Sequence, residues 1–180
     1  MARFFILFVV ILASLFAVEL TPPVQTAIVV PWTQALVRIS ARLITSFDPH
    51  VAVFGDILQS TANGFALSVR AGCNGVEATL ILSAAMLAFP TSWKRRVIGI
   101  LAGVTVVQLL NIVRVISLFY LGQWNMKAFD WAHFYLWPAL IMLDVLIVWM
   151  IWIRSLPRAP SATGPPAGSG DAGAQQATVS

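Results

Sequence analysis

The sequence predicts an all-α integral membrane protein with about four transmembrane helices, plus a small β-ribbon and an amphipathic helix on the outer face. Of its 180 residues, 59% are hydrophobic and only 10% are charged, whereas a soluble domain averages about 25% charged residues. The apolar residues also gather in four long runs. The net charge of +4 comes from basic residues that are scattered or sit at helix ends, which does not indicate a nucleic-acid partner.

The four apolar runs are the candidate membrane spans, and they cover about residues 4–20, 76–89, 97–121 and 131–153. No small-residue cleavage site of a signal peptide follows the first run, so we expect this run to be retained. The second run is short for a hydrocarbon core of about 30 Å. Pro138 lies within the fourth run and predicts a kink there, because proline removes a helical hydrogen bond.

Basic residues next to the runs predict how the chain crosses the membrane. The cluster Lys94–Arg96 lies between the second and third runs, and such clusters are typical of cytoplasmic loops. Arg3 and Arg154 fall on the same side, so both termini are expected in the cytoplasm. We expect one multi-pass membrane domain over residues 1–156. Residues 157–180 are rich in Pro, Gly, Ala and Ser without periodicity, which predicts a disordered cytoplasmic tail.

The segment between the first two runs is expected on the outer side of the membrane. Its first half predicts an amphipathic helix with an apolar face made of Leu36, Ile39, Leu43 and Phe47. Such a helix either lies on the membrane surface or packs on the spans with its arginines in solvent. Farther on, Asn63-Gly64 precedes an alternating apolar stretch and predicts a hairpin turn. We expect a two-stranded ribbon made of residues 51–60 and 65–70.

The only cysteine, Cys73, comes directly before the second run. Asn74 followed by Glu77 resembles a capping box with Asn in place of Ser or Thr, which would put the thiol just before a helix N-cap. Unpaired amides and the helix dipole favour an anion there, so we expect a lowered thiol pKa. Gly72 and Gly75 permit a sharp turn and the close approach of a substrate backbone. The alternative is a small buried cysteine that packs as an apolar residue.

Arg114 lies inside the third run, where inserting an arginine costs about 2.5 kcal/mol or more and therefore requires a reason. With Gln108 and Asn111 it forms a polar strip on one helix face, which we expect to point into the bundle. The functional interpretation is stabilisation of an oxyanion or a substrate carbonyl. The structural interpretation is an ion pair with Asp144, the only acidic residue of the fourth run. Both can hold together.

His133 lies at the start of the fourth run, with Asp130 as its expected N-cap. As a general base it could take the thiol proton and later protonate a leaving amine; the alternative is a histidine within an interfacial aromatic belt. If the runs alternate in direction, Cys73, Arg114 and His133 meet near the outer face, and Cys with His is the minimal constellation of a thiol protease. One cysteine and two histidines are too few for a convincing metal site, and we expect no cofactor.

These motifs resemble the exosortase/archaeosortase family of multi-pass membrane proteins. The matching positions are a box at Gly72–Gly75, then Asn111 with Arg114 three residues later, and finally His133, in the same order relative to the apolar runs. The resemblance covers residues 51–153. The box has glycine directly before the cysteine where many members have alanine. In its shortness and four expected spans the chain is most similar to the exosortase H subgroup.

The resemblance implies a cysteine peptidase or transpeptidase, with Cys73 as nucleophile, His133 as general base and acid, and Arg114 as transition-state stabiliser. We expect Asn74, Gly75, Asn111 and Asp144 to support them. The implied substrates are exported proteins with a C-terminal sorting signal: a short motif (of Ile-Pro-Thr-Leu type for exosortase H), an apolar span and a basic end.

We expect the protein in the bacterial inner membrane, in contact with membrane lipid, with its site facing the periplasm. Two alternatives come from other classes. One is a non-catalytic membrane assembly or transport subunit, and the other is a thiol-dependent acyltransferase that acts on lipid.

Overall fold

The computed structural model describes residues 2–156, so the tail predicted over residues 157–180 lies outside the described residues. The helices are α1 (Ala2–Glu19), α2 (Pro22–Val24), α3 (Val30–Thr45), α4 (Val76–Ala88), α5 (Trp93–Trp124), α6 (Met126–Trp131) and α7 (Trp137–Ser155). Two π-helical turns, η1 (Gln25–Val29) and η2 (Ala132–Leu136), join α2 to α3 and α6 to α7. The strands are β1 (Val51–Phe54), β2 (Ile57–Ser60) and β3 (Ala66–Ser68).

Among the described residues, four helical segments are long and apolar enough to cross a membrane: Ala2–Glu19, Pro22–Thr45, Trp93–Trp124 and Met126–Ser155. The predicted class, an all-α multi-pass membrane protein, is therefore confirmed. The set of candidate spanning helices differs from the predicted set. Residues 22–45, which were expected outside the membrane, are included, whereas α4, which was expected to span, has only 13 residues. Nevertheless α4 is the central helix of the bundle, since it packs against α1, α5 and α7.

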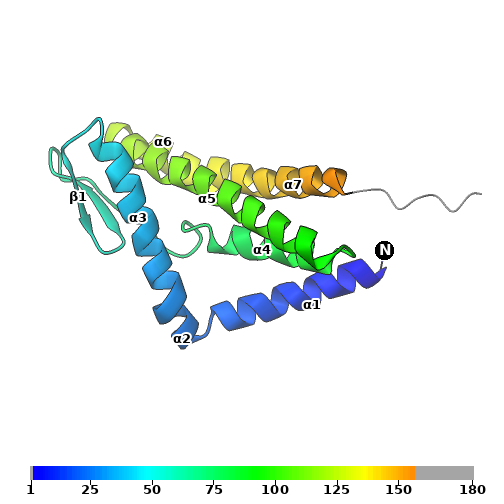
Figure 1. Ribbon diagram of the computed structural model, residues 1–180. Coiled ribbons are helices and arrows are strands. Elements are labelled where there is room, and N and C mark those ends of the chain that lie inside the picture. Colours follow the sequence, from blue (N-terminus) through cyan, green and yellow to red (C-terminus); the bar gives the residue numbers. More distant parts are fainter. Residues whose placement is uncertain (1, 157–180) are drawn as a thin grey trace, which may run out of the picture.

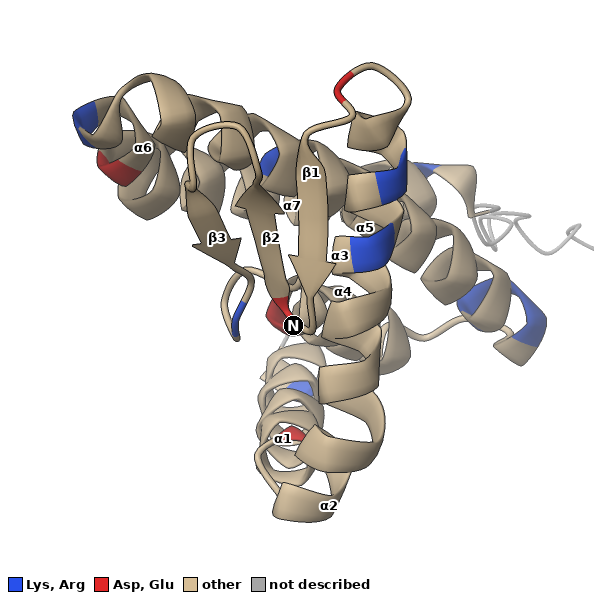
Figure 2. Cartoon of the chain, turned by 90° about the vertical axis from the view of Figure 1, so that its left-hand side faces the viewer, with Lys and Arg blue, Asp and Glu red and all other residues tan. Residues whose placement is uncertain are grey.

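The bundle has two ends of different character. The helices α1, α4, α5 and α7 run roughly along one direction, and α3 crosses them steeply (Figure 1). The strands and α6 gather at one end, which we call the sheet end. The opposite end, which we call the basic end, holds the start of α5 with Lys94–Arg96 and the last turn of α7 with Arg154. Seen from the sheet end, the charged residues are few and scattered (Figure 2).

The expected amphipathic helix is present as α3, but the structure divides its predicted apolar face. Leu36 is buried, whereas Ile39, Leu43 and Phe47 remain exposed. The buried stripe of α3 instead consists of Thr33, Leu36, Val37, Ser40, Ala41 and Ile44. The helix therefore packs on the bundle through one stripe and presents a separate apolar edge outward.

Proline accounts for both π-helical turns. Each turn ends two residues before a proline, η1 before Pro31 and η2 before Pro138. A proline ring collides with the carbonyl four residues earlier, and a widened turn relieves that collision. The kink predicted at Pro138 is thus a widened turn directly before it, and the helical segment continues from Met126 to Ser155.

The β-ribbon has three antiparallel strands in the order β1-β2-β3, where two were predicted. The stretch of residues 51–60, expected as a single strand, folds back at Gly55 through a two-residue loop. Gly55 has a φ of 65°, the left-handed conformation that such a loop needs at its first position. The hairpin predicted at Asn63-Gly64 is confirmed, because β2 and β3 pair across that loop.

Two apolar clusters hold the bundle together, one at each end. The sheet-end cluster joins α3, the strands and the second half of α5. The basic-end cluster joins α4, α5 and α7. Between them on α5 lies a buried polar layer of Gln108, Asn111 and Arg114, so the strip predicted to face the bundle interior is confirmed. Buried polar groups are costly without partners, so this layer marks the place to look for a site.

The packing at the basic end generates a stability prediction. A Cβ at Gly99 would overlap the indole ring of Trp152. Gly99→Ala should therefore lower the free energy of unfolding by about 1–3 kcal/mol through overpacking, although alanine is the better helix former. Thermal unfolding in detergent measures the change, with Leu101→Ala at an exposed position of the same helix as control. Equal unfolding midpoints for the two variants would contradict this packing.

Candidate active site

Cys73 lies in a tight turn directly before α4. Gly72 and Gly75 flank it with φ values of 82° and 73°, left-handed conformations that favour glycine. The predicted capping box is not formed, because Gly75 and not Asn74 occupies the N-cap position. Asn74 accepts a hydrogen bond from the first N–H of α4 at 3.1 Å, and Glu77 accepts one from the N–H of Gly72 at 2.6 Å. Both side chains therefore hold the turn that presents the thiol.

Arg114 reaches from α5 to this turn with both arms of its guanidinium. Nη1 donates to the carbonyl oxygen of Gly72 at 3.0 Å, and Nη2 donates to Sγ of Cys73 at 3.4 Å. The residue is only 3% exposed, so these charge-assisted hydrogen bonds form in a largely desolvated environment, where they are strong.

Asp144 does not take part in this cluster. It lies on α7 beside Val106 and Leu110, one to two helical turns along α5 from Arg114. Its Oδ2 atom has no hydrogen-bond partner among the described residues. The ion pair between Arg114 and Asp144, one of the two interpretations left open by the sequence, is therefore not formed.

The other three predicted supporting residues do gather at the turn. Asn111 is fully buried and lies against Gly75, where a Cβ would come within 3.0 Å of Asn111 Nδ2. Gln108 donates to the carbonyl of Gly75 at 3.2 Å. Asn74 donates to Oγ1 of Thr33 at 3.1 Å, which ties the turn to α3. Two features thus require glycine at position 75: its left-handed backbone conformation and the close approach of α5.

His133 completes the cluster from η2. Both of its ring nitrogens lie 3.9 Å from Sγ of Cys73. The ring of Phe129 stacks almost parallel to the imidazole, with centroids 5.5 Å apart, and Phe134 meets it edge-on at 4.9 Å. Packing thus fixes the imidazole plane beside the thiol. The structure brings together the thiol, the guanidinium and the imidazole that the sequence placed near one face.

The electrostatics of the thiol differ from the prediction. Burial raises the pKa of Cys73 above its usual value, the positive charge of Arg114 opposes the increase, and the negative charge of Glu77 adds to it. The expected lowering at a helix N-terminus is therefore wrong, because desolvation of the thiolate outweighs the favourable charges. Near neutral pH the group is mostly a protonated thiol, so it needs a base to become a nucleophile. His133 is the base within reach.

Sequence reasoning missed two residues that position the cluster. Thr33 anchors Asn74, and no local signal marks it because the two are far apart in sequence. Asn125 is the N-cap of the helical segment that carries His133; its side chain accepts from two backbone N–H groups, while Asp130 lies inside α6. Asn125 could have been recognised, since asparagine is among the strongest N-cap residues. Within residues 2–156 no group of three or more His, Cys, Asp or Glu side chains could hold a metal ion.

The chain also matches a known protein family. Residues 1–151 match the family model described as transmembrane exosortase (Exosortase_EpsH). The chain belongs to the transmembrane exosortase family. No curated protein and no solved structure shows a significant match. The exosortase resemblance drawn from the three motifs is thus confirmed, and membership supports a membrane protein-sorting protease or transpeptidase at the level of the family.

The position of the thiol in this exosortase generates a reactivity prediction. Only the thiolate is alkylated, so the rate of Cys73 alkylation should rise with pH. Arg114→Gln removes the charge that lowers the thiol pKa, so the midpoint of the rate-against-pH curve should move up, with alkylation at pH 8 about tenfold slower for each pKa unit. Glu77→Gln keeps a hydrogen-bond acceptor but removes the charge that raises the pKa, so its midpoint should move down.

The control for this measurement is Arg70→Gln, an exposed arginine three residues before the thiol. It removes the same charge without touching the sulfur and should leave the midpoint in place. The midpoint is the readout because altered access of the reagent changes the rate at every pH but does not move the curve along the pH axis. Coincident midpoints for Arg114→Gln and Arg70→Gln would show that Arg114 does not act on the thiol.

Proposed function

We propose that this exosortase is a membrane cysteine peptidase or transpeptidase in which Cys73 is the nucleophile, His133 the general base and acid, and Arg114 the oxyanion stabiliser. The observation that carries the proposal is the contact of a single thiol with both other groups, 3.4 Å from Arg114 Nη2 and 3.9 Å from the His133 ring nitrogens. A nucleophile, a general base and an oxyanion stabiliser within reach of one another are the minimal set for acyl transfer.

The reaction begins when His133 takes the proton of Cys73 and Sγ attacks the carbonyl carbon of the scissile peptide bond. The electron pair of the C=O double bond moves to the oxygen, and Arg114 donates hydrogen bonds to the resulting oxyanion. Collapse of the tetrahedral intermediate breaks the C–N bond, and protonated His133 gives its proton to the leaving amine. The product is a thioester on Cys73. Water or an amine, deprotonated by His133, then releases the acyl group.

The substrate class and location form the second part of the proposal. The substrates are exported proteins that carry a C-terminal sorting signal, for which the likeness to exosortase H suggests a motif of Ile-Pro-Thr-Leu type. The protein lies in the bacterial inner membrane with both termini in the cytoplasm. The basic end, with Lys94–Arg96 and Arg154, supports this orientation by the positive-inside rule. The thiol and the sheet at the opposite end then face the periplasm.

The two alternative functions are distinguishable from this one. A non-catalytic assembly subunit would tolerate loss of the thiol. The structural pairing that favoured this alternative is also missing, because Arg114 bonds to the Cys73 turn instead of Asp144. A thiol acyltransferase acting on lipid would still require Cys73. Its acyl-enzyme would carry a fatty acyl group, however, where the peptidase carries a protein fragment, so the mass of a trapped thioester separates the two.

Variants of the cluster should abolish or slow processing of a membrane-anchored reporter that ends in such a sorting signal. Cys73→Ala should leave no processed product. Arg114→Lys keeps the charge but loses the planar fork, so turnover should fall by about 10²-fold or more, the scale of losing one oxyanion donor. Immunoblots of reporter and enzyme measure processing against protein level. Arg42→Lys, an exposed arginine outside the cluster, is the matched control, and full activity of Arg114→Lys would remove the arginine from the mechanism.

The proposed orientation predicts which end an impermeant thiol reagent reaches. In a Cys73→Ser background without other cysteines, Thr61→Cys at the exposed β2–β3 loop should be labelled in intact spheroplasts. Lys94→Cys at the basic end should be labelled only after lysis. The opposite pattern would invert the protein and place the thiol on the cytoplasmic side.

A further inference from the structure

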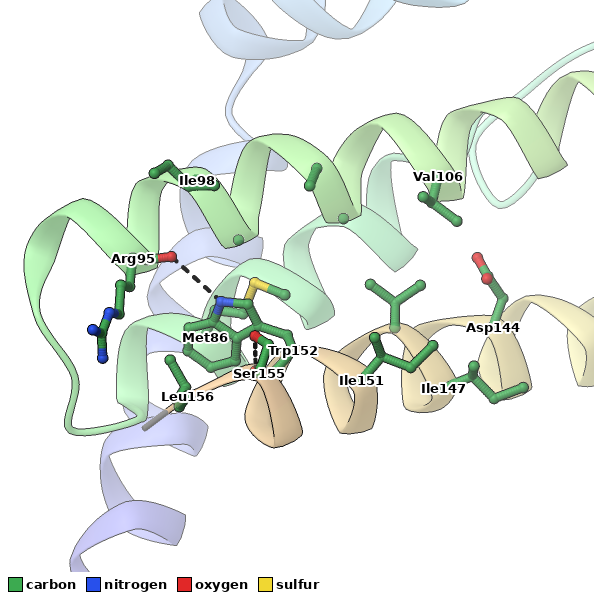
Figure 3. Close-up of a pocket in the computed structure, with 14 residues that line it drawn as sticks. Met86, Arg95, Ile98, Val106, Asp144, Ile147, Ile151, Trp152, Ser155 and Leu156 are labelled. Carbon is green, nitrogen blue, oxygen red and sulfur yellow. Dashed lines mark hydrogen bonds between the residues drawn. The ribbon is translucent and has the colours of Figure 1, made fainter. Parts of the chain in front are cut away.

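A lateral groove between α5 and α7 lies at the basic end, away from the Cys73 cluster. It encloses about 530 Å³. Its walls are mainly aliphatic, with Ile98, Val106, Ile147 and Ile151 among the side chains that line it (Figure 3). Ile98 and Ile151 are more than 60% exposed, so the groove opens toward the side of the bundle, where a membrane protein meets lipid.

Two glycines on α5 shape the floor of the groove. Gly99 and Gly103 lie one helical turn apart, and because they have no side chains, Trp152 and Met86 pack directly against α5. The indole of Trp152 lies against Gly99 as the floor and donates from Nε1 to the backbone carbonyl of Arg95 at 3.3 Å. The terminal methyl group of Met86 reaches the floor beside Gly103. The floor is therefore built from packed, largely inaccessible groups, which makes the groove a fixed feature of the bundle.

The length of the groove matches one leaflet of a bilayer. Figure 3 shows Arg95 with Ser155 at one end and Val106 with Asp144 at the other. Eleven residues separate the two ends on each helix, which corresponds to about 16 Å of helix. Half of a hydrocarbon core of about 30 Å is about 15 Å. An acyl chain that enters at the basic end thus reaches the far end at the bilayer midplane.

The charges at the two ends select the kind of amphiphile. Arg95 lines the groove at the basic end, and Lys94 and Arg154 are exposed on the adjoining turns. The one acidic side chain that lines this groove in the described part of the chain is Asp144, at the opposite end. A phosphate is therefore attracted to the entrance. A transmembrane helix ending in basic residues would be repelled there, which disfavours the sorting signal as occupant.

We propose that this groove binds one anionic phospholipid from the leaflet at the basic end. Its phosphate pairs with Arg95, and one acyl chain lies along the aliphatic wall between α5 and α7. Basic pockets between membrane helices are suited to such head groups. The site is separate from the Cys73 cluster and does not depend on the proposed function.

Native mass spectrometry of the purified full chain tests the proposal, with phosphatidylglycerol and phosphatidylcholine of identical acyl chains as probes. The wild type should retain one phosphatidylglycerol and little phosphatidylcholine. Arg95→Gln should weaken phosphatidylglycerol binding about fivefold, the effect of one basic residue near a charged head group. Lys94→Gln, the neighbouring charge that does not line the groove, is the matched control and should change binding much less.

A second pair of variants tests the groove itself. Ala102→Phe fills it and should reduce lipid retention, whereas Leu101→Phe, an exposed neighbour outside it, should not. Ile151→Phe, on the opposite wall, serves if Ala102→Phe does not fold. Equal retention of the two lipids would overturn the selection of an anionic head group. Equal losses in Arg95→Gln and Lys94→Gln with no effect of the groove fillers would overturn the proposal in favour of general surface attraction. A dimer that the groove fillers abolish would overturn it in favour of a second copy of the chain.

Discussion

The fork that Arg114 makes across the Gly72 carbonyl and the Cys73 sulfur is the contact on which the site depends. A guanidinium buried within a membrane segment is tolerated only when its donors have partners. The turn before α4 supplies partners for Nη1 and Nη2, although not for the buried Nε, because its left-handed glycines turn a backbone carbonyl and a thiol toward α5. The same contact fixes the turn on α5 between the two apolar clusters. The same interaction thus stabilises the buried arginine and positions the nucleophile.

The raised thiol pKa fits the proposed chemistry better than a preformed ion pair would. Burial that disfavours the thiolate also strengthens every charge interaction nearby, including that of Arg114 with an oxyanion. In the resting site burial favours the neutral thiol over the thiolate, so Arg114 is not already paired with a negative charge. Negative charge appears only when the imidazole removes the proton and the sulfur attacks. The environment therefore favours the charge that develops during the reaction over a charge held at rest.

Much of this arrangement could be predicted from local patterns in the sequence. The apolar runs, the polar strip of α5 and the Asn63-Gly64 hairpin follow directly from composition and spacing. The third strand was missed because the Gly55 loop was not recognised within an apolar stretch, and the lowered thiol pKa was wrong because burial cannot be read from neighbours in sequence. The Asn74–Thr33 bond and the distance of Asp144 from Arg114 depend on how the helices cross. No periodicity within one segment determines that crossing.

The shortness of α4 explains why the sheet end is built as it is. Thirteen residues make a helix of about 20 Å, which is less than a hydrocarbon core of about 30 Å. If the C-terminal end of α4 lies near the membrane interface at the basic end, the turn with Cys73 therefore cannot reach the interface at the sheet end. Polar groups at that depth need partners. Thr33 of α3 accepts a hydrogen bond from the Asn74 side chain, and Gln108 of α5 donates to the Gly75 carbonyl. A nucleophile held below the surface can reach a peptide bond only where a chain enters the bilayer. In the proposed function, the depth of the site itself restricts cleavage to membrane-anchored substrates.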